Sequence, residues 1–176
     1  MKIIDLSLPI YNQMPVYPGD PEVEIKQVHT LAEQGWNLRT LFLNTHLGTH
    51  VNVPSHMVET GENLDDLSPD NFCGPAIIYS GSNSVKSGPG IIFRDQNIDE
   101  QIARLLIKAK PKFVGLSEKH EFEIKIEKEL LEAGIISYEN LVNTKKLPSG
   151  KQFMFYGFPL NIKDGDGSPV RAAAII

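Results

Sequence analysis

Short apolar segments that end at Gly, Pro or Asn recur along the chain, and each of them predicts a β-strand. They are rich in β-branched and aromatic residues, which suit the pleated, half-buried surface of a sheet. The predicted strands lie at 2–8, 23–28, 38–45, 76–80, 90–93, 112–117, 152–158 and 170–176. Strands therefore dominate the early part of the chain.

Two stretches in the second half have the apolar spacing of a helix. Asn97 is expected to cap the first helix, because Glu100 follows it three residues later. The apolar positions of this helix are Ile98, Ile102, Leu105, Leu106 and Ala109. A second helix is predicted over 123–133, with Gly134 at its end. Strand and helix alternate from about residue 89 to 138, so the predicted fold is α/β, with a mixed sheet of substantial antiparallel content.

The composition favours one domain with small-molecule partners. A chain of 176 residues with 41% hydrophobic content can bury one sizeable core, so residues 1–176 are expected to form a single domain. A formal net charge of −5 argues against a surface for nucleic acid or an anionic membrane. The sequence has neither a signal-peptide pattern nor a membrane-spanning apolar run, so the cytoplasm is the expected location.

Three histidines and an asparagine are concentrated in "HLGTHVNVPSH", residues 46–56, in a chain with five histidines. Gly48 and Pro54 both disfavour a helix, and the β-branched residues between them do so as well. An extended strand is therefore expected over 44–56.

On such a strand, alternate side chains point the same way, so His46, His50 and Asn52 would share one face. The missing side chain at Gly48 would leave room for a cation between the two imidazoles. Cys73 is the only cysteine, which excludes a cysteine-rich zinc site. The pattern therefore favours a metal site built from imidazole and oxygen ligands. The alternative is that these histidines are ordinary hydrogen-bonded core or surface residues.

Several other motifs are interpreted as loops and turns. The segment 81–87 lacks the glycine that a phosphate-binding loop needs before its lysine, and 115–119 lacks the final glycine of a nucleophile elbow. The segment 164–168 is explained by turn chemistry. Capping or surface roles are assigned to Asp65, Asp66, His29 and His120.

The stretch 46–56 resembles the signature H-x-G-T-H-x-D-x-P-x-H of the cyclase family, which includes bacterial kynurenine formamidases. Further likeness covers nearly the whole chain, in "DLSLPIYNQMPVYPGDPEVEI", "LLEAGIISYENL" and "FYGFPLNIKDGDGSPVRAAAI". The resemblance implies a fold of the swivelling β/β/α type and a homodimer or homotetramer. It also implies a divalent metal, commonly zinc or manganese, that supports hydrolysis of an amide or related carbonyl bond, and it places 164–168 near the active site.

The resemblance also assigns roles to individual residues. The metal ligands that it implies are His46, His50 and Glu139, with Asn52 at the position of the family's aspartate. It assigns proton transfer to His56, and contact with an aromatic or apolar part of the substrate to Tyr17. Glu127 stands where the family has a histidine that helps to hold a second metal.

Two of these positions depart from the family pattern. Asn52 offers one neutral carbonyl oxygen, so it is a poor bridge between two metals. Glu127 lies in a predicted helix, where a glutamate is ordinarily a solvated surface charge. We therefore expect one divalent metal, zinc or manganese, and no second metal.

The expected activity is hydrolysis of a small aryl or acyl amide such as N-formylkynurenine, which would belong to tryptophan catabolism. Water activated by the metal would be the nucleophile. The alternative is a non-catalytic protein that binds small molecules on the same fold, with its metal site degraded at Asn52 and Glu127.

Overall fold

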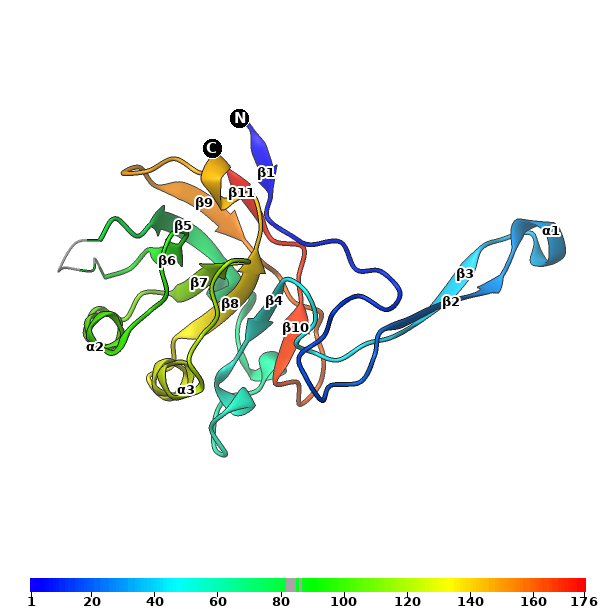
Figure 1. Ribbon diagram of the computed structural model, residues 1–176, viewed down its shortest axis with the longest axis horizontal. Coiled ribbons are helices and arrows are strands. Elements are labelled where there is room, and N and C mark those ends of the chain that lie inside the picture. Colours follow the sequence, from blue (N-terminus) through cyan, green and yellow to red (C-terminus); the bar gives the residue numbers. More distant parts are fainter. Residues whose placement is uncertain (82–84, 86) are drawn as a thin grey trace.

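Figure 1 shows the computed structural model, which describes residues 1–81, 85 and 87–176. Most of the described strands form one nine-stranded sheet, in the order β1-β11-β9-β5-β6-β7-β8-β4-β10. In sequence order these strands are β1 (Ile3–Asp5), β4 (His50–Asn52), β5 (Cys73–Ile78), β6 (Gly90–Phe93), β7 (Phe113–Ser117), β8 (Ile136–Leu141), β9 (Phe153–Tyr156), β10 (Gly167–Pro169) and β11 (Ala173–Ile175). The loop predicted around 81–87 falls partly outside the described residues.

The sheet is mixed, as predicted. Strands β5, β6, β7 and β8 pair in parallel, while β4, β9, β10, β11 and β1 pair with their neighbours in antiparallel fashion. The parallel strands are connected through α2 (Glu100–Ala109) and α3 (Ile124–Glu132), which lie side by side on one face of the sheet (Figure 1). The predicted single-domain α/β fold is therefore confirmed.

Both predicted helices form, and α2 begins two residues later than predicted. The cap of α2 is Asp99, whose side chain accepts a hydrogen bond from the Ile102 N–H, so the predicted Asn97 cap is wrong by two residues. Beyond α3, Gly134 has a left-handed backbone with φ of 75°. Glycine adopts this conformation without steric cost, which explains the helix end at this point.

Successive side chains along a strand point to opposite faces of the sheet, so a hydrophobic core forms on each face. In β6 and β7, Phe93 and Leu116 face the helices, whereas Ile92 and Phe113 face the opposite side. The opposite side is built around three aromatic rings, Phe113, Tyr138 and Phe155, with centroids 4.8 to 5.5 Å apart. Both faces of the parallel strands are thus buried, which matches their almost continuous apolar sequences.

A separate two-stranded hairpin projects from this body (Figure 1). It consists of β2 (Glu24–His29) and β3 (Leu38–Phe42), joined through the single-turn helix α1 (Leu31–Gln34). Both strands of the hairpin were correctly predicted. All residues of β3 are exposed.

Four short 3-10 helices complete the structure: η1 (Pro54–His56), η2 (Leu64–Asp66), η3 (Pro69–Phe72) and η4 (Thr144–Lys146). No helix in the described part of the chain is long and apolar enough to cross a membrane.

Candidate active site

The segment that carries the histidines is not one continuous strand. Only His50–Asn52 forms a strand, and the backbone turns at Gly48, where φ is 58°. The expected strand over 44–56 is therefore wrong at both ends, because a left-handed glycine turns the chain and Pro54 begins η1. A side chain at Gly48 would meet the Met14 methyl group at 3.4 Å, so this glycine does not provide the predicted room between two imidazoles.

The close approach near His46 depends on a different glycine. A Cβ atom at Gly167 would lie 2.8 Å from Cε1 of His46 and 2.7 Å from the Val51 carbonyl oxygen. Strand β10 can therefore pair with β4 beside the imidazole only because residue 167 has no side chain.

Asn52 is the centre of a buried network that includes Glu127, Glu139 and Ser137. Its amide nitrogen donates hydrogen bonds to Oε1 of Glu127 at 2.6 Å and to Oε1 of Glu139 at 2.9 Å. The Ser137 hydroxyl donates to the same oxygen of Glu127 at 2.7 Å. The pairing of β4 with β8 creates this arrangement, since it sets His50 opposite Glu139 and Asn52 opposite Ser137. We call these four residues the Asn52 network.

Glu127 is not the solvated charge that the sequence predicted. It lies on the inner side of α3, is 5% exposed, and reaches the site from the helix layer. Burial, followed by the charge of Glu139, raises the pKa of Glu127. For Glu139, burial acts in the same direction, but the hydrogen bond and charge of His50 outweigh it and lower the pKa. Of the two carboxyl groups, Glu139 therefore has the lower pKa.

The two central histidines have their outer nitrogens bound by protein acceptors. Nδ1 of His50 donates to the Gly48 carbonyl oxygen at 2.9 Å, and Nε2 of His46 lies 2.8 Å from Oδ2 of Asp166. These contacts direct the remaining nitrogens toward the Asn52 network. Nε2 of His50 lies 3.3 Å from Oε1 of Glu139, and Nδ1 of His46 lies 2.8 Å from Oδ1 of Asn52.

The contacts of these inner nitrogens indicate how a divalent cation fits. The amide of Asn52 donates to two carboxylates, so its oxygen faces His46 as an acceptor. A neutral imidazole carries one N–H, which the outer acceptor of each histidine uses. Each inner nitrogen and the oxygen that it faces then both present lone pairs, which repel each other. An extra proton or a cation between the two atoms removes this repulsion. Burial lowers the pKa of His50, but Glu139 outweighs it and raises the pKa, which reflects the same need for positive charge.

His46, His50 and Glu139 have the chemistry of metal ligands, but their potential ligand atoms do not all lie within 4.8 Å of one another, so a cation shared by these three residues stays a prediction. This arrangement also has the usual outer support of metal-binding histidines, a carbonyl oxygen for one and a carboxylate for the other. The Asn52 amide nitrogen donates to both glutamates and so offers neither of them a ligand atom to share.

Asp166 and His56 lie on the open side of His46. The imidazole of His56 packs on that of His46 with centroids 3.9 Å apart, and its Nδ1 lies 3.6 Å from Oδ2 of Asp166. The Thr45 hydroxyl donates to the other oxygen of Asp166 at 2.9 Å. In the described part of the chain, His46, His56 and Asp166 are the one group of three such side chains whose potential ligand atoms all lie within 4.8 Å of one another.

Burial, together with the nearby His46, lowers the pKa of His56, so its imidazole is neutral near pH 7. Asp166 is ionised, because burial raises its pKa less than the contacts with His46 and Thr45 lower it. His56 and Asp166 thus bring a neutral base and an ionised carboxylate together beside His46.

The remaining predicted residues lie further out. Tyr17 is 69% exposed in a turn that is tied to the histidine segment through Asn44, whose amide donates to Asp20 at 2.9 Å. Tyr17 as a substrate contact therefore stays a prediction. His120 contacts Asn97 and His29 packs edge-on against Trp36, in agreement with ordinary surface roles.

Two site residues were missed at the sequence level, Asp166 and Ser137. The segment 164–168 was expected to lie near the active site, and its Asp166 contacts His46, but nothing in its turn-like sequence distinguished this aspartate from Asp164. Ser137 becomes recognisable only once β8 is paired with β4.

Comparison with known proteins identifies the family of the chain. The family described as "Putative cyclase" matches residues 4–116, which is more than half of the chain. The chain is 29% identical over 206 residues to a kynurenine formamidase of Salinibacter ruber, and the match covers 98% of this chain and 96% of the relative.

Two solved structures have the same fold. Isatin hydrolase A from Labrenzia aggregata superposes with a TM-score of 0.84 at 18% identity, covering 99% of this chain and 93% of that one. A predicted metal-dependent hydrolase from Bacillus stearothermophilus superposes with a TM-score of 0.78 at 22% identity, covering 98% and 97%. Together, these matches support a hydrolase, and the chain belongs to the cyclase family.

Proposed function

We propose that this protein is a metal-dependent amidohydrolase that cleaves a small aryl or acyl amide, with N-formylkynurenine as a representative substrate. The observation that carries the proposal is that one nitrogen of each histidine faces an oxygen of the Asn52 network: Nδ1 of His46 lies 2.8 Å from Oδ1 of Asn52, and Nε2 of His50 lies 3.3 Å from Oε1 of Glu139. The names of the relatives support the reaction class, since one is a kynurenine formamidase.

His46, His50 and Glu139 would hold one zinc or manganese ion, with Asn52 assisting. When bound, the cation would lower the pKa of a water molecule and polarise the scissile carbonyl group. Each of these three residues is held in place by the protein: His46 by Asp166, His50 by the Gly48 carbonyl oxygen, and Glu139 by the amide of Asn52.

His56 would accept the proton of the attacking water and then donate it to the leaving nitrogen. Its lowered pKa keeps it in the basic form at neutral pH. Asp166 would stabilise the imidazolium that forms, because its carboxylate is near Nδ1 of His56. Tyr17, exposed in the turn that Asn44 ties to the histidine segment, would cover the aromatic or apolar part of the substrate.

The test compares the wild-type protein with His50→Ala and with the control His120→Ala, which removes a histidine outside the site. Metal content and N-formylkynurenine hydrolysis are measured after purification without chelator. We expect about one equivalent of metal and hydrolysis for the wild type and the control, and a loss of at least about 100-fold in rate for His50→Ala. Equal activity in all three proteins would refute the proposal.

A second candidate, a non-catalytic protein that binds small molecules, is favoured by the Asn52 network, which satisfies two glutamates without any cation. The same experiment separates the two. A wild-type protein that retains no zinc or manganese, yet still binds an aromatic amide, would support this second candidate.

A further inference from the structure

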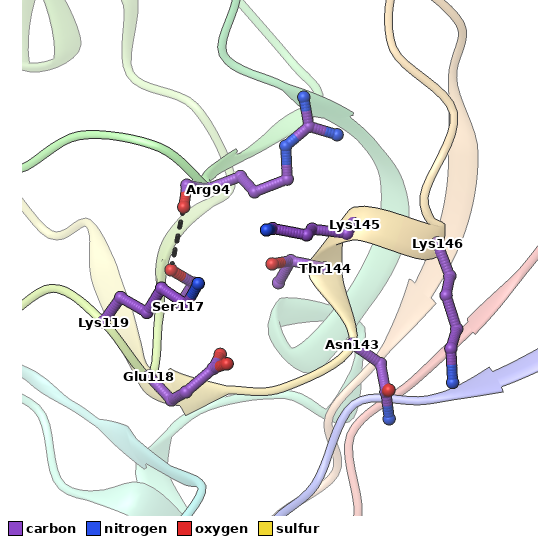
Figure 2. Close-up of a pocket in the computed structure, with 8 residues that line it drawn as sticks. All are labelled: Arg94, Ser117, Glu118, Lys119, Asn143, Thr144, Lys145 and Lys146. Atoms are coloured by element: carbon purple, nitrogen blue, oxygen red, sulfur yellow. Dashed lines mark hydrogen bonds between the residues drawn. The ribbon is translucent and has the colours of Figure 1, made fainter.

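A hollow of about 320 Å³ lies beyond the carboxyl ends of the parallel strands and shares no residue with the histidine site. Residues from the ends of β6, β7 and β8 surround it, since Arg94 follows β6, Ser117 ends β7, and η4 comes shortly after β8 (Figure 2). In α/β sheets, this is the edge where small ligands usually bind.

The walls of the hollow are strongly basic in a chain that is acidic as a whole. Its cations are Arg94, Lys119, Lys145 and Lys146, and its acid is Glu118. Arg94 is already paired with Asp95 at 2.8 Å. The ammonium groups at 119, 145 and 146, in contrast, form no ion pair within the part of the chain that the structure describes. This concentration of unneutralised positive charge favours an anionic ligand.

Thr144 adds a neutral hydrogen-bond donor to the lining of the hollow. The residue is 4% exposed, and its hydroxyl has no hydrogen-bond partner among the described residues. The hydroxyl oxygen itself is not among the buried side-chain atoms that lack a partner, so it is open to the hollow and can donate to a group bound there. Figure 2 shows this hydroxyl next to the Lys145 amine, both directed across the hollow toward Ser117, while Lys146 points away.

We propose that this hollow binds the phosphate group of a small phosphate monoester. Lys145, Lys119 and the Thr144 hydroxyl would bind the phosphate oxygens, since all three donate hydrogen bonds and two carry positive charge. The hollow is larger than one phosphate ion, and the Glu118 carboxylate on its wall accepts hydrogen bonds. The organic part of the ligand therefore carries a hydroxyl group that donates to Glu118.

Calorimetric titration of the full chain with inorganic phosphate, glycerol phosphate and glycerol tests the proposal. We expect glycerol phosphate to bind several-fold more tightly than inorganic phosphate, and glycerol not to bind. Affinity should fall as salt is added, because the contact is between charges near the surface. Equal affinity for the two phosphates would overturn the assignment of a monoester, and it would leave free phosphate as the ligand.

Three variants locate the site. Lys145→Ala and Thr144→Val should each weaken binding of glycerol phosphate by roughly tenfold or more, as expected for loss of a hydrogen bond to a charged group. Lys108→Ala removes an exposed lysine elsewhere on the surface and should bind like the wild type. No binding by the wild type at about 10 mM, or equal binding by all variants, would overturn the proposal.

The site is independent of the hydrolase activity. His50→Ala should therefore keep its affinity for glycerol phosphate, whether or not it loses hydrolysis. Failure of the phosphate proposal and failure of the proposed hydrolase can thus be distinguished in the same set of proteins.

Discussion

Asn52 stands where the cyclase signature has an aspartate. Its amide nitrogen donates hydrogen bonds to neighbouring carboxyl groups, which an ionised aspartate could not do. It donates to Glu127 and Glu139 together, and so holds two carboxyl groups close without a cation between them. An aspartate at 52 would place a third carboxylate in the same buried space. The exchange at 52 is therefore physically linked to the glutamate at 127.

The first prediction concerns this linkage. Asn52→Asp should destabilise the metal-free protein by about 3 kcal/mol or more, since two hydrogen bonds to charged groups are lost and like charges meet. For a chain of this size, the melting temperature should fall by roughly 6–12 °C. Added zinc or manganese should restore much of that loss. Thermal unfolding with and without chelator measures the effect, with exposed Asn161→Asp as control. A metal-free variant as stable as the wild type would contradict this account.

Asp166 supplies the second prediction at the residue scale. Asp166→Asn keeps an acceptor for Nε2 of His46 but removes its charge, so metal affinity should fall by about 10- to 100-fold. Asp164→Asn is a suitable control, because Asp164 is exposed in the same loop and its left-handed backbone suits asparagine. Titration of the metal-free proteins with zinc or manganese measures both affinities. Unchanged affinity in Asp166→Asn would show that the carboxylate does not support the ligand.

At the scale of the elements, helix spacing and strand composition predicted α2, α3 and three of the parallel strands, β5, β6 and β7, while β8 was not among the predicted strands. These elements follow from local patterns that agree with their burial. The segment 44–56 could not be predicted in the same way, because a glycine with φ of 58° and a proline interrupt the strand on both sides of His50. The alternation rule still pairs His50 with Asn52, but His46 reaches the site through a turn.

The close contact between Gly90 of β6 and Phe113 of β7 leads to a prediction about the free energy of unfolding. A Cβ atom at Gly90 would lie 2.1 Å from the ring of Phe113, so Gly90→Ala should destabilise the fold by about 1–3 kcal/mol. Phe113→Leu in the same chain should recover part of the effect of Gly90→Ala, because it removes the atoms that clash. Chemical denaturation of the single and double variants measures this coupling. Strictly additive losses would show that the ring is not the cause.

For the molecule as a whole, the projecting hairpin raises the question of what covers it. Among its exposed apolar residues, Trp36, Leu41 and Phe42 are 56–59% exposed. An isolated two-stranded hairpin is only marginally stable in water. We propose that it packs against another copy of the chain, in the homodimer or homotetramer that the family resemblance implies.

Light scattering coupled to gel filtration tests this proposal. The wild type should have a mass of two or four times 19.6 kDa, and a variant with Leu41→Lys and Phe42→Lys should shift toward the monomer. A monomeric wild type, or an assembly unaffected by both substitutions, would contradict it.

Packing between distant parts of the chain explains which residues of the site could not be predicted from the sequence. Glu127 was expected in solvent because it lies in a charged helix, but α3 packs with this residue inward, against β8. Asp166 comes to His46 only through the pairing of β10 with β4, which joins segments more than 100 residues apart. Long-range pairing of this kind leaves no local signal in the sequence.

The central claim is that one divalent cation is bound by His46, His50 and Glu139. Crystals grown with zinc or manganese, with data collected at the absorption edge of the metal, test it directly. We predict one anomalous peak per chain, bonded to Nδ1 of His46, Nε2 of His50 and a carboxylate oxygen of Glu139. A peak between His46, His56 and Asp166 instead, or no peak in the presence of excess metal, would contradict the account.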